Sequence, residues 1–267
     1  MVGHVHIMGI VNLTEDSFYA GSRVSVANVA ARVRQMLSDG ADTIDFGACS
    51  TRPGSAQPAL EEEWSRLEPA LCEIAGGGQV PGVQSPIISI DTYRAEIVRR
   101  AYEVIGPFMV NDISAGAMDP EMLTAVGRLG LPYVAMHMRG TPETMQQFTD
   151  YGDIVADVKA YFREFSIKAQ DAGIQDWLLD PGFGFAKTLE QNYELLRRMA
   201  ELQELHRPIL VGVSRKSMIY KLLGITPEEA LSATQVVHFA ALERGATWLR
   251  VHDVPEAVQT ARLYLQT

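Results

Sequence analysis

The chain has 267 residues and a formal net charge of −10, and 47% of its residues are hydrophobic while 21% are charged. This composition excludes wholesale disorder, and the acidic balance argues against a nucleic-acid partner, which would require a basic face. The two cysteines have neither metal-ligand nor disulfide spacing. No apolar run reaches the length of a transmembrane helix, so we expect a cytoplasmic protein with no membrane partner.

Short β-branched and apolar runs alternate with segments of helical spacing along the whole chain. The runs that predict strands are residues 6–13, 43–46, 86–90, 108–110, 133–137, 177–179, 209–213 and 248–251. The segments that predict helices are residues 26–37, 60–74, 95–104, 120–129, 154–172, 189–202, 227–243 and 255–265. Eight such alternations predict an α/β protein with a parallel sheet, namely a TIM (β/α)₈ barrel forming a single domain over residues 1–267.

Polar or charged side chains occur at the end of every predicted strand. In a barrel of this type the active site lies at the carboxyl ends of the strands, so these groups would meet at one face. A single polar residue at a strand end is an ordinary turn or cap, but a full set from all strands indicates an enzyme site. The set comprises Asn12, Asp45, Asp91, Asn111, His137, Asp180, Ser214 with Lys216, and Arg250 with His252.

The residue types in this set indicate two binding tasks. One group suits a phosphate or carboxylate, because Arg offers a bidentate fork and Lys a compact charge, and it comprises Arg52, Lys216, Arg250 and His252. Asp91, Asn111 and Asp180 suit a polar, planar heterocycle that carries amidine-like N–H groups. The sequence therefore predicts a phosphorylated heteroaromatic substrate.

Other nucleotide and metal motifs are missing from the sequence. Residues 213–217 contain the Lys-Ser pair of a phosphate-binding P-loop without its glycines, and no Gly-x-Gly-x-x-Gly motif follows the first predicted strand. The histidines show no His-Glu-x-x-His motif and no paired spacing, so we expect no zinc site.

Nearly the whole chain resembles the dihydropteroate synthases, a family of pterin-binding enzymes in the folate pathway. The resemblance rests on motifs in the family's order at residues 8–18, 40–54, 89–92, 110–114, 136–140, 180–185, 214–217 and 250–253. It implies that a dihydropterin-methyl diphosphate is joined to 4-aminobenzoate, releasing diphosphate and dihydropteroate. It also implies a dissociative mechanism with Mg²⁺ as cofactor, and a homodimer that forms through the last helices.

The resemblance further implies roles for individual residues. The pterin site would comprise Asp91, Asn111, Ile113, Met136, Asp180, Phe185, Gly212 and Lys216. The diphosphate site would comprise Asn12, Thr51, Arg52, Arg250 and His252, and the 4-aminobenzoate site Thr51, Arg52, Pro53, Phe185, Ser214 and Lys216. Asp91, Lys216 and Asn12 would be the catalytic residues, and Asn12 would also contact Mg²⁺.

Two other functions stay open at this point. A pterin-binding methyltransferase barrel would share the carboxylate and amide slot and pass a methyl group to a corrinoid protein. It would have no diphosphate to hold, so Lys216 and the pair Arg250 and His252 argue against it. A non-catalytic barrel would bind a pterin or a sulfonamide as a carrier or sensor. The complete set of predicted diphosphate-binding residues argues against that function.

Overall fold

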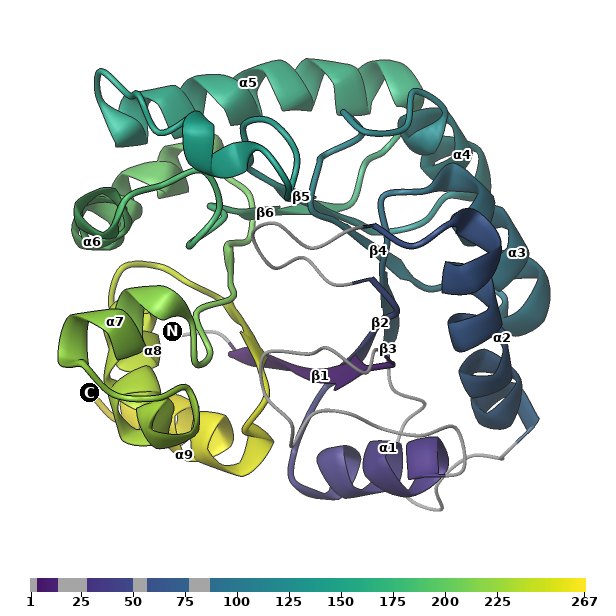
Figure 1. The fold of residues 1–267 in the computed structure, drawn as a ribbon, viewed down its shortest axis with the longest axis horizontal. Coiled ribbons are helices and arrows are strands. Elements are labelled where there is room, and N and C mark those ends of the chain that lie inside the picture. Colours follow the sequence, from purple (N-terminus) through teal and green to yellow (C-terminus); the bar gives the residue numbers. More distant parts are fainter. Residues whose placement is uncertain (1–3, 14–27, 50–56, 77–86) are drawn as a thin grey trace.

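Eight parallel strands surrounded by helices form a (β/α)₈ barrel in the computed structural model, which describes residues 4–13, 28–49, 57–76 and 87–267 (Figure 1). The strands are β1 (His6–Asn12), β2 (Thr43–Gly47), β3 (Ile87–Asp91), β4 (Met109–Asp112), β5 (Tyr133–Met136), β6 (Trp177–Asp180), β7 (Leu210–Val211) and β8 (Trp248–Val251). Their order in the sheet is β6-β5-β4-β3-β2-β1-β8-β7. A parallel bridge between Leu179 and Ile209 joins the two ends of this sheet, which confirms the predicted barrel.

The helices lie outside the strands. They are α1 (Val29–Ser38), α2 (Leu60–Gly76), α3 (Ala95–Ile105), α4 (Met122–Leu129), α5 (Ile154–Ala172), α6 (Leu189–Arg198), α7 (Ser217–Leu223), α8 (Leu231–Leu242) and α9 (Val254–Tyr264). Short 3₁₀ turns are η3 (Met145–Gln147), η4 (Met199–Leu205) and η5 (Glu228–Ala230). Among the helices that the structure describes, none has both the length and the apolar content needed to cross a bilayer.

Local sequence signals explain where two of the long helices begin and end. Asp153 caps α5, because its carboxylate accepts the backbone N–H groups of Val155 and Ala156. Gly173 ends the same helix in the left-handed conformation that glycine adopts without strain. Thr188 and Gln191 form a capping box at the start of α6, in which each side chain accepts the other residue's backbone N–H.

The observed elements differ from the sequence predictions at four places. Helix α7 was not predicted, because seven residues are too few to show a helical period. The predicted helix at residues 189–202 changes to a 3₁₀ turn at Met199, and the one at 227–243 starts as a 3₁₀ turn. Strand β7 is shorter than the predicted 209–213, since the backbone N–H of Lys216 donates to the carbonyl of Val213 and the chain is already turning there.

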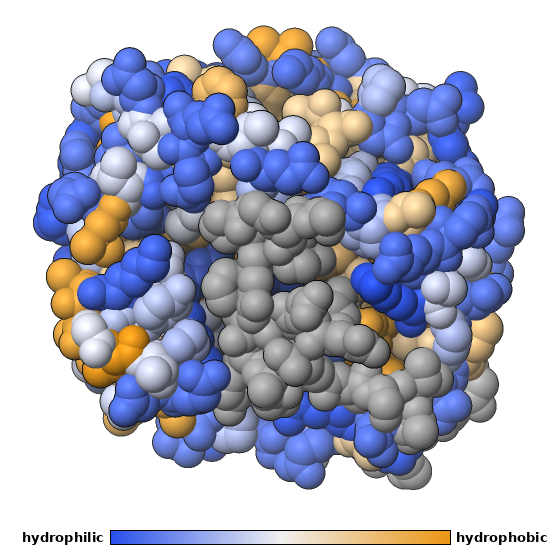
Figure 2. Space-filling view, in the orientation of Figure 1, coloured by the Kyte–Doolittle hydropathy of each residue, from blue (hydrophilic) through white to orange (hydrophobic). Residues whose placement is uncertain are grey.

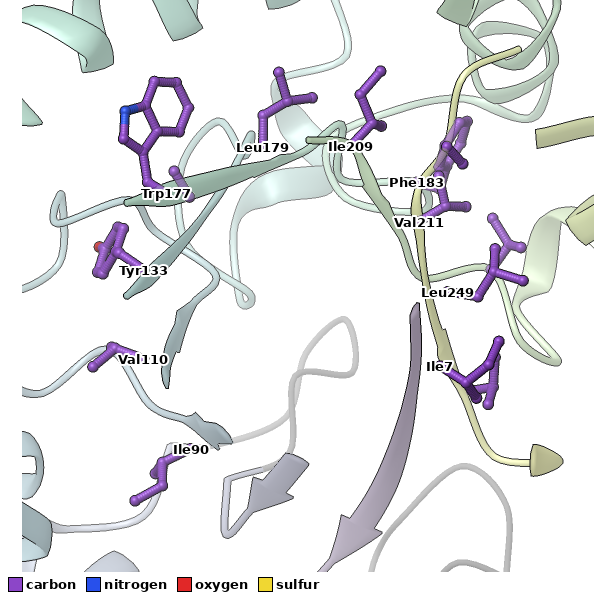
Figure 3. Packing of buried hydrophobic residues seen from close by; sticks show 14 of the residues in the cluster. Ile7, Ile90, Val110, Tyr133, Trp177, Leu179, Phe183, Ile209, Val211 and Leu249 are labelled. Carbon is purple, nitrogen blue, oxygen red and sulfur yellow. The ribbon is translucent and has the colours of Figure 1, made fainter. Parts of the chain in front are cut away.

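The apolar core has two layers because successive strand side chains point to opposite faces of the sheet. Outward side chains such as Ile7, Ile90, Tyr133, Trp177 and Leu249 pack toward the helices (Figure 3). A second cluster is buried separately from the first and takes one residue from each of six strands: Met8, Met109, Val134, Leu178, Leu210 and Trp248. It fills the barrel interior, so the space left for a site is at one end of the barrel.

Candidate active site

The strand register brings the predicted polar residues to one level at the carboxyl end of the barrel. Asn12 pairs with Gly47, Gly47 with Asp91, and Asp91 with Asn111 across β1, β2, β3 and β4. Asp180 is the last residue of β6, opposite Met136. The sequence motifs that were predicted to meet are therefore neighbours in space.

Two glycines, Gly47 and Gly212, lie next to these polar side chains. A Cβ atom placed on Gly47 would lie 3.6 Å from Asn12 Oδ1 and 3.7 Å from Asp91 Oδ2. A Cβ atom placed on Gly212 would lie 3.9 Å from Asp180 Oδ2, 3.9 Å from Lys216 Nζ and 3.9 Å from the Cβ of Arg250. Polar groups from different strands thus surround each glycine, and any larger residue would occupy the space between them.

The guanidinium group of Arg250 binds two carboxylates. Its Nε atom donates to Asp45 Oδ2 at 2.7 Å, and its Nη2 atom donates to Asp91 Oδ2 at 2.7 Å. Asp45 is fully buried and also accepts hydrogen bonds from Ser89 Oγ at 2.6 Å and Asn111 Nδ2 at 3.2 Å. Burial raises the pKa of Asp91 to about 7, and the nearby charge of Arg250 opposes that rise.

This network bears on the roles that the sequence predicted for Asp45 and Arg250. Asp45 was predicted to lie at the mouth of the barrel but was given no binding or catalytic role. A carboxylate within an apolar strand is buried on folding and therefore requires a hydrogen-bonding or charged partner. Arg250 was predicted to bind diphosphate, and the structure places its side chain against protein carboxylates. Its contact with diphosphate stays a prediction.

Lys216 lies between the end of β6 and an aromatic ring. Its Nζ atom donates to the carbonyl of Phe183 at 2.7 Å and lies 4.7 Å from the centre of the Phe185 ring. Burial lowers the pKa of Lys216 to about 8, and the carboxylate of Asp180 opposes that shift. Burial also raises the pKa of Asp180, whose carboxylate accepts the backbone N–H of Gly182 at 2.8 Å.

A buried lysine holds the loop that follows β6. Lys187 Nζ donates to the carbonyls of Gly182 at 2.9 Å and Phe185 at 3.0 Å, and it lies 3.0 Å from His137 Nδ1. Burial lowers the pKa of Lys187 to about 7. The loop also requires glycine at position 182, where φ is +69° and a Cβ atom would lie 2.0 Å from the His137 carbonyl oxygen. Lys187 was not predicted, since only folding brings these acceptors to its amine.

A cluster of buried apolar side chains lies beside the polar residues at the strand ends. Ile113, Met136 and Phe185 belong to one buried cluster with Tyr93 and Met138. These three residues were predicted as walls of the pterin site, and the structure brings them together. A planar ring beside Asp180 would therefore meet apolar surface as well as hydrogen-bonding groups.

The loops after β7 and β8 are tied to each other. The backbone N–H of His252 donates to Ser214 Oγ at 3.2 Å. Arg215 binds Asp253 through Nε at 2.8 Å and Nη2 at 3.0 Å, a buried bidentate pair. Burial lowers the pKa of His252 to about 3, so its imidazole is neutral at pH 7. The predicted residues Thr51, Arg52 and Pro53 lie outside the described residues.

Known proteins share both the sequence and the fold of this chain. The model of the pterin-binding enzyme family matches residues 8–252. The dihydropteroate synthase of Escherichia coli K12 is 42% identical and covers 98% of this chain and 91% of its own length. That of Neisseria meningitidis serogroup C is 43% identical, with 93% and 87% covered.

Solved structures agree with these relatives. The Yersinia pestis dihydropteroate synthase in a sulfonamide complex superposes with a TM-score of 0.91 at 35% identity, covering 98% of this chain and 94% of that one. The Xanthomonas albilineans enzyme with 4-aminobenzoic acid has a TM-score of 0.87 at 37% identity, with 99% and 93% covered. The chain therefore belongs to the pterin-binding enzymes, in the dihydropteroate synthase family.

Proposed function

We propose that this chain condenses a dihydropterin-methyl diphosphate with 4-aminobenzoate, giving dihydropteroate and diphosphate. The observation that carries the proposal is the meeting of Asp180 and Lys216 at Gly212, where an added Cβ atom would lie 3.9 Å from both Asp180 Oδ2 and Lys216 Nζ. A carboxylate, an ammonium group and apolar walls at one point suit a flat heterocycle with N–H donors and a carbonyl acceptor. The solved relatives named above were crystallised with a sulfonamide and with 4-aminobenzoic acid, which fits the second substrate.

The pterin would bind by hydrogen bonds to buried groups. Asp180 would accept the ring and exocyclic N–H groups, and Asn111, held by its contact with Asp45, would contact the opposite edge of the ring. Ile113, Met136 and Phe185 would cover its faces. Lys216 touches both proposed sites, because its Nζ atom lies near Asp180 on one side and over Phe185 on the other.

The reaction would begin with cleavage of the bond between the pterin methylene carbon and the diphosphate oxygen. Diphosphate leaves with the electron pair, and the remaining cation is stabilised by resonance with the pterin ring. The carboxylate of Asp91 would offset this transient positive charge. The lone pair of the arylamine nitrogen then forms the new C–N bond, and the nitrogen releases one proton to solvent.

The groups around Asn12 fit a Mg²⁺ ion. The Asn12 amide oxygen and an Asp91 carboxylate oxygen meet at Gly47, 3.6 Å and 3.7 Å from the position of an added Cβ atom. Mg²⁺ takes oxygen ligands and commonly binds one or two side chains together with phosphate oxygens and water. Asn12 would hold the ion against the diphosphate, where the ion neutralises charge on the leaving group.

The last helices offer a surface for a second copy of the chain. Four large apolar side chains are exposed on α7, α8 and α9, namely Leu222, Leu223, Val236 and Leu263. Figure 2 shows apolar residues gathered at the lower left, the side on which α7 and α9 lie. We expect a cytoplasmic homodimer that buries this surface, and equilibrium sedimentation of the purified chain tests the stoichiometry.

A diphosphate-release assay tests the proposed reaction. With Mg²⁺ and the pterin diphosphate present, release should depend on 4-aminobenzoate, and the product should carry both rings by mass spectrometry. Methyl transfer from methyltetrahydrofolate to a corrinoid protein, without diphosphate release, would instead establish the methyltransferase function. Pterin binding without turnover at any Mg²⁺ concentration would establish a carrier or sensor.

A further inference from the structure

Three possible metal ligands meet at the end of the barrel opposite the active site. His4 precedes β1, His6 is its first residue, and Asp42 directly precedes β2. His4 Nε2 lies 2.9 Å from Asp42 Oδ1, and one ligand atom from each of the three residues lies within 4.8 Å of the others. The seven residues from His6 to Asn12 span about 20 Å of strand, so this cluster is remote from the proposed Mg²⁺ position.

Other contacts orient these side chains before any ligand arrives. The second carboxylate oxygen of Asp42 accepts the backbone N–H of Ile7 at 2.8 Å, which fixes the carboxylate between the two strands. The His6 ring stacks on Trp248 with ring centres 4.3 Å apart, and its centre lies 4.6 Å from that of the His4 ring, edge to face. Hydrogen-bonded carboxylates and packed imidazoles are the arrangement that metal sites use to hold their ligands.

The chemistry of the donors selects the class of metal. Two imidazole nitrogens and one carboxylate oxygen suit Zn²⁺, Ni²⁺ or Cu²⁺, whereas Mg²⁺ prefers an all-oxygen shell. The His4 side chain is 61% exposed and that of Asp42 31%, so an ion can enter from solvent.

We propose that His4, His6 and Asp42 form a transition-metal site, with Zn²⁺ as the reference ion and water completing its coordination. The ion links the start of β1 to the residue before β2 and stabilises the closed barrel without taking part in the condensation. No zinc site was expected from the sequence, because the histidines show no His-Glu-x-x-His motif and no paired spacing typical of zinc ligands. His4 and His6 are two residues apart in an extended segment, and Asp42 joins them only through strand pairing.

Calorimetric titration with ZnCl₂ tests the site, using the untagged chain in a Cys72→Ser background because Cys72 is an exposed thiol. The parent should bind one Zn²⁺ saturably, and its melting temperature should rise by roughly 5 °C or more at a hundredfold excess over Kd. His4→Ala should bind at least about tenfold more weakly, since it removes one of three ligands. His6→Phe keeps the stacking on Trp248 and should have the same effect.

Matched variants make the result decisive. Asp42→Asn keeps an oxygen for the Ile7 N–H but removes the charge, and it should also weaken binding. His206→Asn, at an exposed position with φ of +52°, should bind like the parent. Equal Zn²⁺ affinity in the parent and His4→Ala, or an equal Zn²⁺-induced melting shift in the two, would overturn the proposal. The condensation rate of His4→Ala in Mg²⁺ should match the parent, and a lost rate would overturn the purely structural role.

Discussion

Gly212→Ala would add one methyl group at the floor of the proposed pterin slot. The new Cβ atom would lie 3.9 Å from Asp180 Oδ2, from Lys216 Nζ and from the Arg250 Cβ, which is ordinary van der Waals contact. The φ angle of Gly212 lies outside the left-handed region, so alanine adopts this backbone without strain. The substitution therefore leaves the protein intact and fills space that the proposed substrate needs.

The expected effects on stability and on catalysis have opposite signs. Replacing glycine with alanine at a compatible position stabilises a protein by about 0.4–1 kcal/mol, because the unfolded chain loses freedom. One additional methyl group in a binding pocket costs about 1–3 kcal/mol, or roughly 10–200-fold in kcat/KM. Steady-state diphosphate release and a urea titration measure the two quantities on the same preparation.

Gly152→Ala is the matched control, since Gly152 is exposed and a Cβ atom there would have no neighbour within 4 Å. It should leave both kcat/KM and the KM for the pterin diphosphate at the wild-type values. If Gly212→Ala binds the pterin diphosphate as well as wild type, the slot does not lie over Gly212. If instead it unfolds at lower urea concentration, the geometric reasoning about its Cβ atom is wrong.

Four further predictions concern charged groups. Lys216→Ala should lower kcat/KM by roughly 10²–10³-fold, because it removes a partly buried cation between the two proposed substrate sites, and near-wild-type turnover would refute that role. Arg250→Met leaves the carboxylates of Asp45 and Asp91 without their cation and should lower the free energy of unfolding by about 3–5 kcal/mol; an unchanged urea midpoint would contradict this. Lys187→Met should lower the free energy of unfolding by about 1.5–3 kcal/mol and raise the KM for the pterin diphosphate, because the carbonyls of the loop after β6 lose their hydrogen-bond donor. A variant with wild-type values of both quantities would show that the amine does not hold this loop. The pH profile of kcat/KM should be bell-shaped, because the active form has Asp91 deprotonated and Lys216 protonated. Activity should rise as pH passes about 7, where Asp91 loses its proton, and fall above about pH 8, where Lys216 loses its proton. A flat profile from about pH 6 to about pH 9 would exclude both assignments.

The position of each strand could be predicted because the signal is local. Each strand is a short β-branched run, and its polar end residue comes next in the chain, so the sequence alone predicts that Asp91, Asn111 and Asp180 lie together. The predicted elements fail where the local signal is weak, as in the seven-residue helix α7 and the two-residue strand β7. Of the two, β7 lies at the seam where the sheet closes against β6.

The partners of the buried charges could not be predicted from sequence. Arg250 meets Asp45 and Asp91 across 205 and 159 residues of chain, and the pairing depends on how far each strand is shifted against its neighbour. A shift of one residue would turn every side chain of a strand to the other face of the sheet.

The sequence by itself determined the number and order of the strands and the residue types at the mouth of the barrel, because both follow from neighbours in the chain. Only the tertiary structure decided that the Arg250 guanidinium faces carboxylates, that the Lys187 amine holds the loop around Phe185, and that Asp42 lies near two histidines at the opposite end. Those contacts depend on strand register and on barrel closure, which join groups distant in the sequence and leave no periodic pattern to read.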